Sequence, residues 1–163
     1  MPVIWDTTLV SRVRPGSSAL SYFEAKASSA ERVLIPATSV MEVSWGYSHL
    51  DLSRPAGSKF LYWFGSFIAR PEVAVLPFAR AAAVAAGRVR ARAPFPARAH
   101  KRDRRSKADR RVAWAFDMQI AATAWAFGVP VATENVADFT RLAAVLAELY
   151  PRAKPLEVLP SPL

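Results

Sequence analysis

Apolar and polar positions alternate along the chain in blocks that predict strands and helices in turn. Short apolar runs that end at a proline or at a polar residue are typical of buried strands; they occupy residues 2–5, 32–36, 73–76 and 129–132, and a further run at 156–159 is expected to be an edge strand. Longer helix-forming stretches lie between them, up to about residue 30, from residue 39, and at about 55–69, 78–93, 111–127 and 139–149. This order predicts an α/β fold with three α/β/α layers and a central, mainly parallel sheet of four to five strands.

Composition favours one globular domain that spans residues 1–163. The chain is 52% hydrophobic, which is enough to build a core, and it has no cysteine, which excludes disulfides and thiolate metal sites. The N-terminus has no basic segment of the secretory type, and Gly128-Val129-Pro130 interrupts the longest uncharged run, residues 118–133. We therefore expect a cytoplasmic protein with no membrane contact.

Positive charge is concentrated in one segment. The net charge is +9, and eleven of the 22 Lys and Arg residues lie between residues 88 and 111, where only two acids accompany them. Residues 94–111 are expected to form an exposed, mobile, basic insertion that could bind the backbone of RNA, although such a run is also typical of an ordinary solvated surface. The candidate nucleic-acid-binding residues are Arg98, Lys101, Arg102, Arg104, Arg105, Lys107, Arg110 and Arg111.

Acidic and amide side chains occupy positions where a site could form. Asp6 follows the first predicted strand, Asn135 and Asp138 follow the late strand at 129–132, and Glu42 and Asp117 lie on predicted helices. Ligands of parallel sheets bind beyond the carboxyl ends of the strands. Carboxylate and amide oxygens are the donors that Mg²⁺ and Mn²⁺ prefer, and a cation would compensate Asp117, the only charged residue between Arg111 and Glu134.

Each of these residues also has a purely structural interpretation. Asp6 could cap a helix that starts at Thr7, and Glu42 fits a capping box in which Ser39 is the N-cap. Asp117 could complement a helix dipole, and Asn135 and Asp138 could be turn or cap residues. The combination of all five in one strand-and-helix order favours a site.

Four pieces of the sequence resemble the PIN-domain ribonucleases, and among them the VapC-type toxins of toxin–antitoxin pairs. They are "VIWDTTLV", "TSVMEVSWGY", "AFDMQIAATAWAFGVPVAT" and "ENVADF", and together with their context they cover nearly the whole chain apart from the basic insertion. The resemblance implies a PIN-like fold. It also places Asp6, Glu42 and Asp117 at the family's acidic metal positions.

The same resemblance assigns further roles. Thr8 would orient Asp6, and Thr133 would support the site at the end of its strand. The fourth acidic position falls on Asn135, so either Asn135 or the nearby Asp138 would be the remaining ligand. Glu134 stands where the family often has a basic or polar residue, and it is expected to add negative charge at the site.

The function implied by the resemblance is metal-dependent hydrolysis of RNA. In this interpretation Asp6, Glu42, Asp117 and Asp138 are catalytic, Mg²⁺ or Mn²⁺ is the cofactor, and the cation is held by these acids together with Asn135. The partners would be an RNA substrate, a cognate antitoxin and a second copy of the chain, with the aromatic residues of 60–67 serving as core or dimer contact. The alternative is a nucleic-acid-binding protein on a catalytically degenerate PIN scaffold, motivated by the amide at residue 135. An aspartyl-phosphate phosphatase is disfavoured because Thr8 stands where its second Asp belongs.

Overall fold

The computed structural model describes residues 2–28, 32–53, 57–96 and 105–163. Its elements in chain order are β1 (Val3–Trp5), α1 (Thr7–Val10), α2 (Ser18–Ser28), β2 (Val33–Pro36), α3 (Ala37–Ser53), α4 (Gly57–Ile68), β3 (Val73–Leu76), α5 (Arg80–Arg92), α6 (Lys107–Phe127), β4 (Val131–Thr133), α7 (Val136–Leu149) and β5 (Val158–Pro160). None of the helices in these residues combines the length and apolar character that a membrane crossing requires.

The strands form one parallel sheet in the order β3-β2-β1-β4-β5. Ile4 of β1 is aligned with Leu34 of β2 on one side and with Val131 of β4 on the other, so β1 is the central strand. The chain builds outward from β1 to β3 and then returns to the other side of β1 with β4. The carboxyl ends of β1 and β4 therefore flank the point where strand order reverses, which is the usual ligand position in such sheets.

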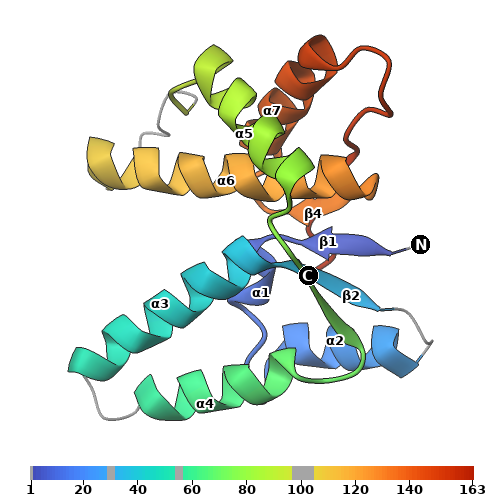
Figure 1. Ribbon diagram of the computed structural model, residues 1–163. Helices are drawn as coiled ribbons and strands as arrows, with labels where there is room; N and C mark the ends of the chain where they lie inside the picture. The colour runs from blue at the N-terminus through green and yellow to red at the C-terminus, as the bar shows by residue number, and fades with distance from the viewer. Residues whose placement is uncertain (1, 29–31, 54–56, 97–104) are drawn as a thin grey trace.

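Helices cover both faces of the sheet (Figure 1), which confirms the predicted α/β/α arrangement. Alternate residues of β1 point to opposite faces. Ile4 joins a buried cluster with residues of α5, α6 and α7, whereas Trp5 joins a second cluster with residues of α1, α2 and α4. In the second cluster the Trp5 and Phe23 rings meet edge to face with centroids 6.4 Å apart. The packing of Ile4 and Trp5 into two apolar clusters thus fixes the position of β1 and of Asp6, which follows it.

Three helix starts differ from the sequence-based expectation. α3 begins at Ala37, directly after β2, so Ser39 lies inside the first turn and the interpretation of Ser39 and Glu42 as a capping box is wrong. α7 begins at Val136 instead of near residue 139, because Asn135 ends the loop after β4 and takes the N-cap position.

The third difference concerns the predicted basic insertion. α6 begins at Lys107 instead of near Arg111, because Ser106 and Asp109 form a capping box there. Residues 107–111 are therefore helical, while residues 97–104 lie outside the described part of the chain.

Candidate metal and nucleic-acid site

Asp6 lies at the carboxyl end of β1 and is almost fully buried, with 1% of its surface exposed. Its Oδ1 accepts hydrogen bonds from the Thr8 hydroxyl at 2.7 Å and from the Leu9 N–H at 3.1 Å, so Asp6 does cap α1. Its Oδ2 accepts a bond from the Thr133 hydroxyl of β4 at 2.6 Å. Burial raises the pKa of the Asp6 carboxyl, and these hydrogen bonds oppose the rise.

Thr133 joins the ends of β1 and β4. It is fully buried, and its hydroxyl oxygen also accepts the Asn135 N–H at 2.9 Å. A single hydroxyl thus orients Asp6 and fixes the backbone of the loop that carries Asn135. The predicted supporting positions of Thr8 and Thr133 both lie beside Asp6, as their hydrogen bonds demonstrate.

Glu42 reaches the same region from the second turn of α3. Its carboxylate accepts a short hydrogen bond from the Thr7 hydroxyl, whose oxygen is 3.2 Å from Ser39 Oγ. Burial raises the pKa of Glu42, the Thr7 bond lowers it, and the negative charge of Asp6 raises it further. Thr7 was not among the predicted site residues, although a hydroxyl residue next to an acid at a strand end was a usable signal.

Asp117 is held in the middle of α6 with its carboxylate turned toward the other acids. Burial is the main cause that raises its pKa to about 8, and the negative charges of Asp6, Glu42 and Asp138 raise it further. The Asn135 amide works in the opposite direction because its Nδ2 donates to Asp117 Oδ2 at 3.2 Å. The same Nδ2 donates to Asp138 Oδ2 at 3.1 Å. Asn135 and Asp138 therefore both lie at the site, and the amide bridges two carboxylates.

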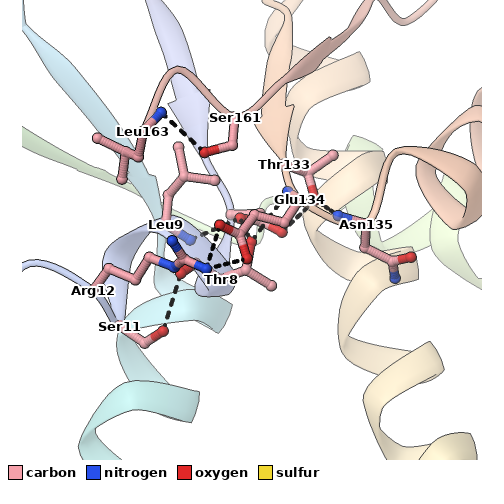
Figure 2. A network of polar contacts seen from close by, with 10 residues as sticks. Thr8, Leu9, Ser11, Arg12, Thr133, Glu134, Asn135, Ser161 and Leu163 are labelled. Atoms are coloured by element: carbon pink, nitrogen blue, oxygen red, sulfur yellow. Dashed lines mark hydrogen bonds and ion pairs between the residues drawn. The ribbon is translucent and has the colours of Figure 1, made fainter. Parts of the chain in front are cut away.

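An ion pair closes one side of this region (Figure 2). The guanidinium of Arg12 lies 2.7 Å from a Glu134 carboxylate oxygen, and the Glu134 N–H donates to Thr8 Oγ1 at 3.3 Å. Glu134 therefore brings its negative charge to the border of the site, where Arg12 pairs with it. Arg12 was not predicted, and its distance along the sequence from Glu134 left no local signal.

The carboxylate and amide groups of the site are of the chemical type that binds hard divalent cations. All the converging groups offer oxygen atoms as ligands. A bound cation would offset the cost of burying the carboxylates and their mutual repulsion, which together raise the carboxyl pKa values. Within the described residues, however, no three His, Asp or Glu side chains already have metal-chelating geometry. Their oxygens are held instead by hydroxyl and amide donors, so a cation would have to displace some of these bonds.

The candidate nucleic-acid-binding residues are only partly described. Arg98, Lys101, Arg102 and Arg104 lie outside the described residues, whereas Arg105 and Lys107 are exposed. The Arg111 guanidinium lies 4.7 Å from the centroid of the Phe95 ring, and Arg110 Nε is buried with no hydrogen-bond partner in the described part of the chain. Arg110 and Arg111 thus pack against the protein at least in part, which leaves a smaller exposed basic surface than the sequence suggested.

Comparison with known proteins shows a likeness at the level of structure. No family model and no curated protein matches the sequence. One chain of VapBC2 from Rickettsia felis, solved with a DNA fragment from their promoter, matches with a TM-score of 0.60 and 15% identity over 98% of both chains. DNA-bound VapBC from Salmonella typhimurium matches with a TM-score of 0.60 and 19% sequence identity over 98% of both chains. FitAcB from Neisseria gonorrhoeae matches with a TM-score of 0.60 and 20% sequence identity, over 98% of this chain and 96% of the FitAcB chain. The protein therefore has the fold of a chain in these complexes, as its resemblance to VapC-type proteins predicted.

Proposed function

We propose that this protein is a Mg²⁺- or Mn²⁺-dependent endoribonuclease that acts as the toxin of a type II toxin–antitoxin pair. The observation that carries the proposal is the convergence of Asp6, Glu42 and Asp117 from three separate elements. Burial is the main cause that raises the pKa of Asp117 to about 8, and the charges of the neighbouring acids raise it further. A fold has no general need for three carboxylates with unfavourable electrostatics in one place, and such groups are typical of functional sites.

The cation would supply Lewis-acid activation of water and would stabilise negative charge on the phosphate during hydrolysis. The protein's own residues hold the acids in place for this chemistry. Thr133 and Thr8 fix both oxygens of Asp6, and Thr7 fixes Glu42. Asp6, Glu42, Asp117, Asn135 and Asp138 would hold the cation through their side-chain oxygens.

Protein partners are part of the proposal. Large apolar side chains are exposed on α3 and α4, among them Trp45 at 70% and Tyr62 at 82%. Phe64 and Phe67 of the same aromatic stretch are buried, so this stretch contributes both to the core and to the surface. Exposed apolar groups of this size favour a protein contact, and the VapBC and FitAcB structures with the same fold support an antitoxin or a second copy as the partner.

The decisive experiment is cleavage of RNA by the purified protein with Mg²⁺ or Mn²⁺. We expect cleavage by the wild type and by Glu148→Gln, which makes the same carboxyl-to-amide change at an exposed position of α7. Asp6→Asn and Asp117→Asn should lower the rate by at least about 100-fold, and EDTA should abolish it. Cleavage that survives both substitutions or EDTA would contradict the assignment of the site.

The alternative is a nucleic-acid-binding protein that no longer cleaves. Asn135 in place of an acid and the lack of ready chelating geometry among the described carboxylates favour it. Its expected result is tight, salt-sensitive RNA binding with no cleavage under any metal condition.

A further inference from the structure

A solvent-open hollow of about 400 Å³ lies beside the acidic site, between the end of α1 and the start of α2. Its lining residues are Ser11, Arg12, Arg14, Ser18, Ala19 and Leu163. The lining contains two guanidinium groups and no carboxylate side chain. Ser18 and Ala19 belong to the first turn of the eleven-residue helix α2, where the helix dipole is positive. The hollow therefore presents the guanidinium of Arg14, whereas the guanidinium of Arg12 at its border is paired with Glu134.

Arg14 is anchored at its backbone but free at the end of its side chain. Its N–H donates to Ser17 Oγ at 3.0 Å, and the same oxygen accepts the Leu20 N–H at 3.1 Å, which ties the loop to the start of α2. Its Nε donates to the Ser11 carbonyl at 3.2 Å. The two terminal nitrogens have no hydrogen-bond partner among the described residues, so they can donate to a ligand in the hollow.

Arg12 connects the hollow to the acidic site (Figure 2). Its guanidinium is paired with Glu134, the Glu134 N–H donates to Thr8, and the Thr8 hydroxyl donates to Asp6. This chain of contacts places the hollow within a few hydrogen bonds of the carboxylate at the end of β1. Arg12 therefore lies between the hollow and the acidic site.

We propose that this hollow is a subsite for a backbone phosphate of the RNA strand, next to the phosphate that is hydrolysed. Phosphate accepts bidentate hydrogen bonds from guanidinium groups, and the exposed Ser18 hydroxyl adds a further donor. Glu134 holds Arg12 at the border of the two regions in the free protein and gives up part of this contact to the incoming phosphate. The assignment rests on the proposed function for the identity of the strand, while the anion site itself rests on the arginines.

Binding of a short single-stranded RNA, measured by fluorescence anisotropy in EDTA, tests the subsite without cleavage. Arg12→Ala and Arg14→Ala should each weaken binding by about 5–10-fold. Each should also reduce the slope of log K against log salt by about 0.7, the value for one lost phosphate contact on a single strand. Glu134→Gln should strengthen binding, because it removes a negative charge and releases Arg12. Arg152→Ala removes the same charge at an exposed position after α7 and should change affinity less than about twofold.

A variant that keeps the positive charge separates phosphate contact from a structural effect. Arg14→Lys should recover part of the affinity and most of the salt slope, whereas Arg14→Gln should behave like Arg14→Ala although it preserves more of the side-chain length. Thermal midpoints of all variants should match that of the wild type, because both arginines are exposed. In a series of RNAs that each carry one neutral methylphosphonate linkage at a different position, one member should bind the wild type more weakly than unmodified RNA. That member and unmodified RNA should bind Arg14→Ala with equal affinity.

The outcomes distinguish this inference from the proposed function. RNA cleavage by the wild type, together with unchanged affinity and salt slope in Arg12→Ala and Arg14→Ala, would overturn the subsite and leave the nuclease proposal intact. Loss of RNA affinity in both variants, together with no cleavage by the wild type under any metal condition, would overturn the nuclease proposal and retain the phosphate subsite.

Discussion

Asp117 carries the largest electrostatic burden at the candidate site, because it is set into an apolar helix and faces three other acids. In the metal-free protein its partial compensation comes from Asn135, whose Nδ2 lies between Asp117 and Asp138. An amide can donate to both carboxylates without adding negative charge. Asn135 thus offsets part of the repulsion between Asp117 and Asp138.

The raised pKa of Asp117 predicts how stability depends on pH. In the metal-free protein the free energy of unfolding should fall as the pH rises from about 4 to about 8, because the folded state keeps a proton that the unfolded chain releases. The loss from this one group is at most about 1.4 kcal/mol per pH unit and ends above pH 8. Asp117→Asn should reduce this slope and stabilise the metal-free protein by about 1–3 kcal/mol at pH 8, as measured by urea unfolding at several pH values.

The control for this prediction is Glu148→Gln, an acid-to-amide change on the exposed face of α7. It should leave the pH dependence of unfolding unchanged. A metal-free Asp117→Asn protein that is less stable than the wild type at pH 8 would show that the carboxylate makes favourable contacts which outweigh its burial.

At the scale of elements, α6 illustrates how a local cap overrides charge density. Residues 105–111 are rich in Arg and Lys and resemble a loop in the sequence, yet the helix starts at Lys107. The Ser106 hydroxyl oxygen accepts the Asp109 N–H at 3.0 Å, and Asp109 returns a bond by accepting the Ser106 N–H at 3.3 Å. At the other end Gly128 has φ 67°, a left-handed conformation that favours glycine and ends the helix before β4.

This cap predicts a measurable effect on stability. Ser106→Ala should lower the free energy of unfolding by about 1 kcal/mol, because it leaves the Asp109 N–H without its acceptor. The matched control is Ser66→Ala in α4, where the exposed hydroxyl donates to the Tyr62 carbonyl inside the helix. Chemical denaturation of both variants measures the difference. An equal effect of the two substitutions would contradict the role of Ser106 as the N-cap of α6.

At the scale of the whole molecule, a cation should link the elements that supply the acids. Asp6 follows β1, Glu42 lies on α3 and Asp117 lies on α6. The helices α3 and α6 cover opposite faces of the sheet (Figure 1). Repulsion between these carboxylates opposes the docking of the two helical layers at this edge of the sheet. An ion bound between them would convert that repulsion into attraction and would stabilise the folded state.

The expected result is a rise in thermal midpoint when Mg²⁺ or Mn²⁺ is added. At a cation concentration about 100 times the dissociation constant, the free energy of unfolding should rise by about 2.7 kcal/mol. The rise in thermal midpoint should be larger at pH 8 than at pH 6, because the acids must lose their protons to bind the ion. Differential scanning fluorimetry measures this directly, with NaCl of equal ionic strength as the control. An equal rise with NaCl, or with Asp6→Asn, would contradict a cation site at these residues.

Much of the architecture was predictable from the sequence because its signals are local. Apolar runs of strand length, each followed by a polar residue, predicted the order of strands and helices and placed Asp6 and Asn135 at strand ends. The uncompensated charge of Asp117 in an apolar stretch indicated a site before any contact was known. Helix starts were less predictable, since α3 follows β2 without a capped loop and α6 is started by a cap within a charged segment.

Only the tertiary structure decided how the acids are held and what lies beside them. Thr7 bonds Glu42 across 35 positions, and Arg12 bonds Glu134 across 122 positions, so these two pairings could not be recognised from neighbouring residues in the chain. The orientation of Asn135 toward two carboxylates, and the basic hollow beside the acidic edge, likewise depend on how β1, β4 and the helices pack. The sequence by itself determined which chemical groups reach the edge of the sheet, because periodicity acts over a few residues. Packing over the full length of the chain determined their partners, because hydrogen bonds and ion pairs form between groups that only the fold brings together.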